Sequence, residues 1–459
     1  MRKPFLSFLA LLLCLLACNF PARIQSSPQT ETTIPFDAPT QTEIAAPTAT
    51  LIPTETPAPT AMIVSGYPLI TVPIQAIRVM DDDGGRITKI TSAQVAAFVS
   101  KANEIYAWSG IQFSFSEQDF SLLQSTLLNN IAGVEDKNWF DEIAYADQVA
   151  AQYPDKLVIF FRWGPGDQPT GGAFSWVDYN FVAMSGFDTG VCGYQNIGML
   201  AHEIGHYLGL VHTFPRVYKD VAEAEAALKS NSNDPTTFDA DGFSDTPPDP
   251  FIALDEYQCQ PVSGVTLNGI FFPVPRDNIM SYYEVRTGLS EMQIERARWT
   301  FSTRMAHGMS MPKNAGAPNP LEAENLSLLS YSGCGTLTQD MSSWGKQQWN
   351  NGDQLFVTSG KSCAVILGLP VKQAGKYRLE LYLTSAPDFG MIQVYLDGKP
   401  VGEPIDLYTP LVMPTGALPV GTFDLAAQTH QLTFMVVGTN EKSKNYSFGL
   451  DCFSLIPQP

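Results

Sequence analysis

The stretch from His202 to His212 constrains the fold more than any other part of the chain. It reads HEIGHYLGLVH, which has the spacing H-E-x-x-H-x-x-G-x-x-H. Residues four apart share one face of a helix, so His202 and His206 can point at a single metal ion with Glu203 beside it. Glycine tolerates a left-handed backbone, so a helix that ends at Gly209 would let the chain turn sharply. The pattern predicts that this turn brings His212 to the same ion as a third ligand.

Three imidazole ligands leave a fourth coordination position, which is typical of a catalytic zinc site rather than a structural one. At such a site Glu203 would act as general base, taking a proton from a metal-activated water and passing it to the leaving amine. The shorter pattern H-E-x-x-H also occurs by chance on helix surfaces. The chain has only five histidines, and three of them fill the longer pattern. We expect the other two, His307 and His430, to be ordinary polar or capping residues.

The region before the motif alternates between strand and helix patterns. Residues 74–79 predict a strand, and Thr91 with Gln94 forms a capping box ahead of apolar residues at helical spacing. Residues 111–115 alternate as a strand does, and residues 157–161 form the continuous apolar run of a strand covered on both faces. This order of elements predicts an α/β unit with a twisted mixed sheet.

The chain changes character near residues 311–320, which are rich in Pro, Ala and Asn. Short alternating apolar runs follow, separated by turn signals such as Asp397-Gly398 and Pro414-Thr415-Gly416. Evenly spaced strands without helical patterns predict an all-β sandwich.

The N-terminal segment has the layout of a secretory signal. Arg2 and Lys3 precede an apolar run over residues 5–16. The run ends in Leu-Leu-Ala-Cys, which resembles the lipobox of bacterial lipoproteins and would make Cys18 the acylated first residue; the alternative is ordinary cleavage near Ala17. Residues 21–60 contain 8 Pro and 10 Thr and predict an extended tether. We therefore expect an exported chain, lipid-anchored to the outer face of the cell membrane.

The net charge of the chain limits the kinds of partner that it can bind. The chain has 27 basic and 46 acidic residues, a formal net charge of -19. This is the wrong sign for binding a phosphate backbone or an anionic lipid surface. We expect no nucleic acid partner, and membrane contact only through the lipid anchor.

Export to an oxidising compartment makes disulfides plausible. Cys192 and Cys259 bracket the histidine motif and are the expected pair. The C-terminal part holds three cysteines and so allows one internal bridge, for which we favour Cys334 with Cys452 over a pairing that uses Cys363. Five cysteines remain after the signal and the anchor, so at least one thiol stays free or pairs elsewhere.

The histidine motif, followed by Thr213-Phe214, resembles the metzincin zinc peptidases, and among them the pappalysin (ulilysin-like) family. The resemblance implies an α+β catalytic domain with a zinc helix, and hydrolysis of peptide bonds. Residues 277–282, Asp-Asn-Ile-Met-Ser-Tyr, resemble the family's Met-turn. This implies that Met280 packs beneath the metal. It also implies that Tyr282 lies near the metal, where its phenol could stabilise the tetrahedral intermediate. Without the histidines, Met280 would be one more core methionine among 14, and Tyr282 a packed ring.

Two further stretches belong to the same resemblance. Residues 241–247 resemble the family's calcium-binding segment, in which Asp241 and Thr246 would supply hard oxygen ligands; the alternative is an acidic loop capped by prolines. Residues 172–174 would form part of an edge strand to which a peptide substrate adds. Many relatives are kept latent by a pro-segment cysteine on the zinc. No cysteine lies between Cys18 and Cys192, so we do not expect that form of latency.

The C-terminal unit resembles the galactose-binding-like or carbohydrate-module jelly rolls that accompany exported enzymes. The resemblance rests on residues 374–379, 394–398 and 448–451. It implies carbohydrate as a candidate ligand. Trp344 and Trp349 could stack on sugars or could be buried core aromatics.

Together these patterns predict a signal peptide over residues 1–18, a tether over 19–65, a zinc peptidase domain over 66–312, a linker over 313–325 and a β-sandwich over 326–459. The predicted function is that of a secreted, lipid-anchored zinc metalloendopeptidase that acts on protein or peptide substrates, with zinc and a candidate calcium as cofactors. The alternative is a surface adhesion or glycan-binding lipoprotein with an inactive metal-binding scaffold.

Overall fold

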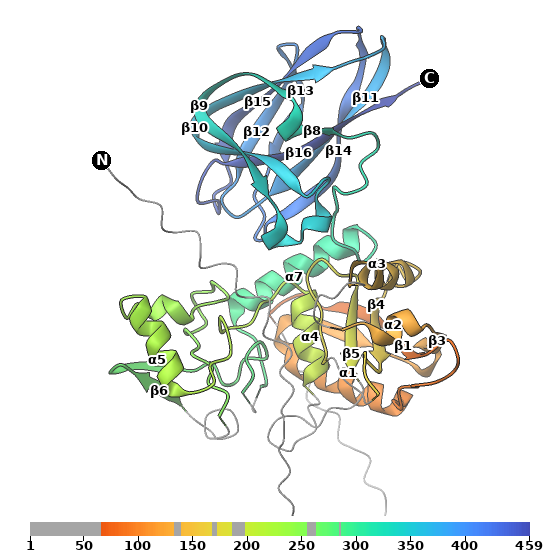
Figure 1. Cartoon of the computed structure of the whole chain (residues 1–459), viewed down its shortest axis with the longest axis vertical. Coiled ribbons are helices and arrows are strands. Elements are labelled where there is room, and N and C mark those ends of the chain that lie inside the picture. The colour runs from red at the N-terminus through yellow and green to blue at the C-terminus, as the bar shows by residue number, and fades with distance from the viewer. Residues whose placement is uncertain (1–65, 133–138, 168–171, 186–197, 255–262, 284–285) are drawn as a thin grey trace, which may run out of the picture.

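The computed structural model describes residues 66–132, 139–167, 172–185, 198–254, 263–283 and 286–459. An α/β unit comes first and an all-β unit follows at the C-terminus (Figure 1). The predicted signal, tether and lipidation site Cys18, and the predicted pair Cys192 and Cys259, lie outside the described residues. Within the described ranges, no helix combines the length and the apolar character needed to cross a membrane.

The α/β unit is built on a five-stranded sheet with β1 at its centre. All the named strand pairs are parallel: β1 (Ile70–Met80) pairs with β2 (Ile111–Ser114), β3 (Phe120–Gln124) and β4 (Leu157–Arg162), and β4 pairs with β5 (Phe181–Ser185). Beyond β5, Phe174 forms one antiparallel bridge with Ala183. The predicted α/β unit and the three strands predicted in it are confirmed. In the part that the structure describes, however, the pairings between its strands are all parallel, and the antiparallel part expected of a mixed sheet is limited to the bridge at Phe174.

Helices cover both faces of this sheet. On one face, α1 (Ser92–Tyr106) and α4 (Met199–Tyr207) share a core cluster with β1, β4 and β5. On the other face, α2 (Thr126–Asn130) and α3 (Trp139–Ala150) pack against the same strands. All six residues of β4 are buried, as expected for a strand covered on both faces. The predicted capping box of Thr91 and Gln94 begins α1.

A small cluster of its own follows the histidine motif. It contains α5 (Val221–Ser230) and the hairpin of β6 (Gly264–Leu267) and β7 (Ile270–Pro273), packed around aromatic residues. The long helix α7 (Glu291–Ala306) comes next and lies on the side of the α/β unit that faces the all-β unit (Figure 1). Its buried Arg304 donates hydrogen bonds to the carbonyl oxygens of Tyr207, at the end of α4, and of Val177 and Tyr179. Arg304 therefore ties α4 to the segment beside β5.

The C-terminal unit is a nine-stranded antiparallel sheet, as predicted for an all-β unit. Its strands are β8 (Leu321–Glu322), β9 (Ser327–Asp340), β10 (Asp353–Pro370), β11 (Gly375–Ser385), β12 (Gly390–Leu396), β13 (Lys399–Asp406), β14 (Met413–Leu425), β15 (Thr429–Thr439) and β16 (Phe448–Pro457). The long strand β10 changes partner along its length, pairing first with β16 and later with β15. β10 thereby links β15 and β12 to β16 and β11 within one sheet.

The two predicted turn signals have different outcomes. Asp397 and Gly398 both have positive φ, 49° and 76°, and connect β12 to β13 in a hairpin as predicted. The prediction of a turn at Pro414-Thr415-Gly416 is wrong, because these residues lie inside β14. They lie at a register shift against β11, where Gly416 takes a positive φ of 71°.

The segment predicted as a linker is packed against the all-β unit. Asn314 is fully buried, donates a hydrogen bond to the Leu383 carbonyl at 2.9 Å and accepts one from the Gly416 amide at 3.0 Å. Leu321–Glu322 already pairs with β16. Strand pairing thus begins five residues before the predicted start of the sandwich at residue 326.

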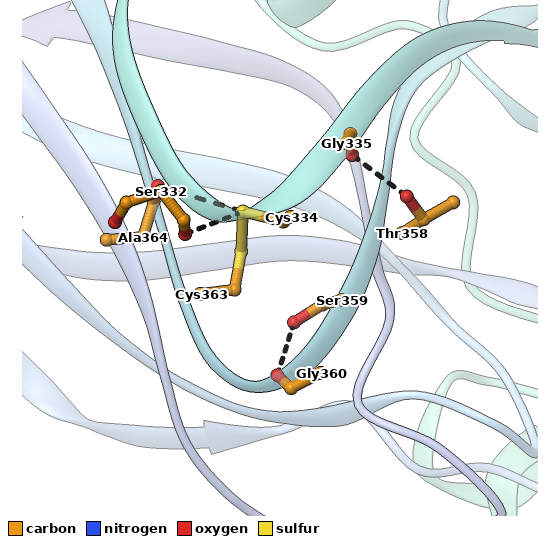
Figure 2. The surroundings of a disulfide bond; sticks show 8 residues. All are labelled: Ser332, Cys334, Gly335, Thr358, Ser359, Gly360, Cys363 and Ala364. Atoms are coloured by element: carbon orange, nitrogen blue, oxygen red, sulfur yellow. Dashed lines mark hydrogen bonds between the residues drawn. A yellow bond between two sulfur atoms is a disulfide. The ribbon is translucent and has the colours of Figure 1, made fainter.

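The favoured pairing of Cys334 with Cys452 is wrong. Cys334 forms its disulfide with Cys363, with the two Cα atoms 5.3 Å apart (Figure 2). The two cysteines lie on the adjacent antiparallel strands β9 and β10, close to a register shift in their pairing. Cys452 is a buried free thiol, packed beside Ala317 and Tyr382.

The tryptophans divide between the two interpretations. Trp349 is buried and donates a hydrogen bond to the Thr384 hydroxyl at 2.8 Å, so it is a core residue. Trp344 is 36% exposed at the end of a short 3-10 turn.

Candidate metal centre

The three histidines of the motif converge through the same ring nitrogen. The Nε2 atom of His212 lies 3.2 Å from that of His202 and 3.1 Å from that of His206. The helix α4 places His202 and His206 one turn apart, and it ends at Tyr207. Gly209 then adopts a left-handed φ of 78°, as predicted, and turns the chain so that His212 returns to the other two rings.

These separations fit one tetrahedral ion. Nitrogen ligands about 2.0–2.1 Å from a tetrahedral zinc lie about 3.3–3.4 Å from one another. The observed 3.1 and 3.2 Å are close to that value. The three rings form one of two groups within the described part of the chain whose ligand atoms lie near enough together to hold a metal.

The other ring nitrogen of two of the histidines faces a backbone carbonyl. Nδ1 of His202 lies 2.6 Å from the Ile279 oxygen, and Nδ1 of His206 lies 2.8 Å from the Leu210 oxygen. A carbonyl only accepts, so each Nδ1 carries the proton and each Nε2 presents its lone pair to the shared point. These contacts fix both the ring orientation and the tautomer that a metal needs.

Burial keeps the imidazoles neutral. It lowers the pKa of His206 to about 4, and it lowers the pKa values of His202 and His212 well below the ordinary range. The neighbouring imidazoles and the Arg286 guanidinium lower the pKa values of His202 and His212 further. Neutral rings are the form that binds a metal, so no proton needs to be displaced near neutral pH.

Glu203 lies on α4 directly after the first ligand and is only 4% exposed. Burial raises the pKa of its carboxyl to about 8, against the opposing effects of Arg286, a backbone hydrogen bond from Ser175 and Arg162. A divalent cation among the three imidazoles would lower this pKa and favour the carboxylate. Glu203 is therefore a buried, proton-accepting group one residue from a metal ligand.

Met280 packs beneath the centre, where the Met-turn resemblance placed it. It is fully buried, and its sulfur lies against the backbone of α4 at Gly205. A Cβ atom added to Gly205 would lie 2.3 Å from the Met280 sulfur, so this helix position needs glycine. The Thr213 amide donates a hydrogen bond to the Met280 carbonyl at 3.3 Å, which joins the chain after the third ligand to this turn.

Tyr282 lies beside the metal ligands, as the same resemblance implied. Its ring centroid is 5.4 Å from that of His202 and 4.9 Å from that of His212. The rings of Phe214 and Phe251 pack against it at 4.8 and 5.7 Å. This packing holds the phenol at the edge of the centre.

A buried carboxylate that the sequence did not reveal connects the segments around the centre. Asp249 accepts hydrogen bonds from the hydroxyls of Thr213, Ser281 and Tyr283 at 2.6, 2.8 and 2.9 Å. Burial raises its pKa to about 6, although the hydroxyl donors oppose the rise. Thr213 follows the third ligand, while Ser281 and Tyr283 flank Tyr282, so Asp249 sets the position of both segments. Its position between two prolines in the sequence gave no signal of this role.

Asp241 and Thr246 do lie together. The Thr246 hydroxyl is 2.7 and 2.9 Å from the two Asp241 carboxylate oxygens and 3.0 Å from the Phe243 carbonyl. The Phe243 amide and the Gln293 side chain also donate to the Asp241 carboxylate. Protein donors thus surround this carboxylate, which fits the acidic-loop interpretation as well as the calcium one.

The second group able to hold a metal lies in the all-β unit and was not foreseen. It comprises Glu322, Asp451 and Cys452. One carboxylate oxygen each of Glu322, Glu324 and Asp451 is buried without a hydrogen-bond partner. Burial, and to a lesser degree the charges of the two glutamates, raise the pKa of Asp451 to about 7. Buried, unpaired carboxylate oxygens are the hard ligands that calcium prefers.

The segment beside β5 forms one side of the centre. Phe174 exchanges two backbone hydrogen bonds of 2.9 Å with Ala183, so residues 172–174 touch the sheet edge through a single bridge rather than a full strand. The Trp176 ring lies 5.7 Å from the ring of His206.

The two remaining histidines are ordinary polar residues, as predicted. Nδ1 of His307 lies 2.8 Å from the Thr303 carbonyl at the end of α7. His430 pairs with Asp397 at 2.6 Å in the all-β unit.

No protein-family model and no curated protein matches the chain. A solved structure that it resembles in part is a Paenibacillus xanthan lyase, 22% identical over 32% of this chain and 14% of that one, with a TM-score of 0.28. A Podospora anserina GH26-CBM35 β-(1,4)-mannanase is 16% identical over 30% of this chain and 27% of its own, with a TM-score of 0.21. A family 35 carbohydrate binding module from Clostridium thermocellum is 17% identical over 30% of this chain and 98% of its own, also with a TM-score of 0.21. The chain spans well under a third of the first two proteins, and similarity at such TM-scores identifies neither its family nor its function.

Proposed function

We propose that this chain is a zinc-dependent endopeptidase of the metzincin kind, exported and held at the outer face of the cell membrane by a lipid on Cys18. The observation that carries the proposal is the convergence of three neutral imidazoles, with Nε2 separations of 3.1 and 3.2 Å, next to a buried carboxyl on the same helix. A site that only held a metal for stability would not need Glu203, because a closed structural site uses four protein ligands.

Each side chain at the centre has a distinct role in the proposal. Zinc, when bound, supplies Lewis acidity that lowers the pKa of water and polarises a peptide carbonyl. Glu203 accepts the proton of the attacking water at a carboxylate oxygen and later delivers it to the leaving nitrogen. The Ser175 backbone, which hydrogen-bonds to Glu203, orients that carboxylate.

Positioning and water exclusion come from the residues around the ligands. Tyr282, held by Phe214 and Phe251, can donate a hydrogen bond to the oxygen that gains charge in the transition state. Met280 fills the space beneath the zinc helix and keeps water from that side. The Phe174 segment offers a substrate backbone an edge on which to pair.

The test combines metal content with cleavage of a denatured protein. We expect the purified chain to hold one zinc, to cleave the protein, and to lose activity when a chelator removes the metal. Glu203→Ala should keep the zinc and lower kcat/KM by roughly 10²–10⁴-fold. His206→Ala should lose the zinc, whereas His307→Ala, which changes a histidine outside the centre, should behave as the unchanged chain.

Two results would overturn the proposal. Cleavage that survives Glu203→Ala would exclude Glu203 as the base. A tightly bound zinc with no turnover of any protein or peptide would favour the rival, a glycan-binding or adhesion lipoprotein with an inactive metal scaffold.

A further inference from the structure

The turn after α4 is packed from three sides. Gly209 takes the left-handed φ of 78° that this turn needs, and it carries no side chain of its own. A Cβ atom placed there would lie 2.9 Å from Thr300 Oγ1 on α7, 3.0 Å from Leu411 Cδ1 and 3.4 Å from Val177 Cγ2. Leu411 belongs to the all-β unit, between β13 and β14. A side chain of the all-β unit therefore contacts the turn that leads to the third histidine.

The backbone of this turn sets the position of two of the three metal ligands. The Leu210 amide donates a hydrogen bond to the Gly205 carbonyl at 2.9 Å, and the Leu210 carbonyl lies 2.8 Å from His206 Nδ1. His212 follows Leu210 by two residues. A shift of the turn would therefore rotate the His206 ring and move His212 away from the point that the three rings share.

The restraint on this turn comes from the atoms packed on it, because glycine has the greatest backbone freedom of any residue. Leu411 can supply such a restraint, since its own backbone is held in place. Its carbonyl accepts a hydrogen bond from the Thr409 hydroxyl at 2.7 Å. The Thr409 amide donates to the Ala386 carbonyl at 3.3 Å, and Val412 packs against the core of the all-β unit.

A second segment of the all-β unit contacts the same side of the centre. Gln347 Nε2 donates a hydrogen bond to the Asp178 carboxylate at 3.0 Å. Asp178 directly follows Val177, which packs on the turn after α4. It also lies two residues after Trp176, whose ring is 5.7 Å from that of His206. The all-β unit thus braces the surroundings of the metal ligands at two separate places.

We propose that Leu411 is a positioning residue of the metal centre, which makes the all-β unit a working part of that centre. The inference rests on the proposed binding of zinc by the three histidines. Leu411 acts through the backbone of Gly209 and Leu210, which carries the effect of its packing to His206 and His212.

The experiment measures zinc affinity in the full chain, by competition with a chromophoric chelator after the metal has been removed. Leu411→Ala should raise the zinc dissociation constant on the order of tenfold, at the lower end of what the loss of an orienting contact costs. Leu411→Val should raise it by less, and Leu411→Met, which keeps the volume, should leave it near that of the unchanged chain. Leu329→Ala is the matched control, because it truncates a leucine that is 48% exposed on β9.

Cobalt(II) in place of zinc separates positioning from general stability. It accepts the same imidazole ligands, and its visible absorption depends on their geometry. At a temperature where every variant is folded, we expect an altered cobalt spectrum in Leu411→Ala and an unaltered one in Leu411→Met and Leu329→Ala.

Three results would overturn the inference and leave the peptidase proposal standing. The first is an unchanged zinc dissociation constant in Leu411→Ala, or in Leu411→Val if the alanine variant does not fold. The second is an equal loss of affinity in Leu329→Ala, and the third is weaker zinc binding with an unaltered cobalt spectrum. Failure of the unchanged chain to bind zinc would instead overturn the proposed function, and this inference with it.

Discussion

Gly205→Ala is the most informative substitution at the zinc helix. Gly205 is a helical residue, so alanine fits its backbone, and by helix propensity alone the change would stabilise α4 by about 1 kcal/mol. The new Cβ would lie 2.3 Å from the sulfur and 3.1 Å from the methyl carbon of Met280, and 3.4 Å from the Tyr106 hydroxyl. Non-bonded carbon atoms prefer separations of about 3.5–4.0 Å, so Met280 must move by more than roughly 1 Å.

The movement of Met280 determines whether Gly205→Ala stabilises or destabilises the fold. Met280 is fully buried, and overpacking a buried site costs about 1–3 kcal/mol. Set against the gain in helix propensity, the net loss in the free energy of unfolding should be on the order of 1 kcal/mol. Zinc affinity should fall as well, because Met280 lies between Ile279, whose carbonyl orients His202, and the loop that carries Tyr282.

Denaturant unfolding of Gly205→Ala, Met280→Ala and the double variant, each with zinc bound and removed, forms a double-mutant cycle. We expect the double variant to be more stable than the sum of the single changes predicts, by about 1 kcal/mol or more, since the cavity left by Met280 accepts the new methyl group. Gly360→Ala is the control, because a Cβ there meets no atom within 4 Å. If Gly205→Ala is as stable as the unchanged chain and its effect adds to that of Met280→Ala, the packing argument is refuted.

Three further outcomes follow from the structure. The pKa of Asp249 is raised to about 6 in the folded chain. The stability that Asp249 contributes is therefore full below the unfolded pKa of about 4 and is lost as the pH rises through about 6. Urea titrations between about pH 4 and 7 should show this decline in stability for the unchanged chain and no such decline for Asp249→Asn. Calcium should raise the temperature of unfolding of the all-β unit in scanning calorimetry, and Asp451→Asn should abolish the rise; an equal rise in that variant would exclude the cluster as the site. Cys334→Ser opens a disulfide with a sequence separation of 29, which should lower the free energy of unfolding by about 3–4 kcal/mol. Equal losses of unfolding free energy in Cys334→Ser and Cys452→Ser would contradict the observed pairing.

Sequence reasoning succeeded where a local pattern determines the backbone. The turn after α4 needed a left-handed residue, and Gly209 provides it with a φ of 78°. A run of apolar residues predicted β4, and the structure buries every residue of that strand. In each case the signal lies within one short segment, so a single sequence is sufficient to read it.

The failures involve residues brought together from distant parts of the chain. The pairing of Cys334 depends on the register between β9 and β10, which alternation of apolar residues does not fix. Asp249 gathers hydroxyls from two separate segments, and Asp451 lies beside Glu322 from the other end of the all-β unit.

The central claim is that His202, His206 and His212 bind one zinc and leave its fourth position open. X-ray absorption at the zinc edge of the purified full chain tests this directly. The account predicts three imidazole nitrogens and one light, non-imidazole atom at about 2.0–2.1 Å. A sulfur ligand at about 2.3 Å, or a fourth imidazole, would mean that the position is filled by protein and would contradict the account.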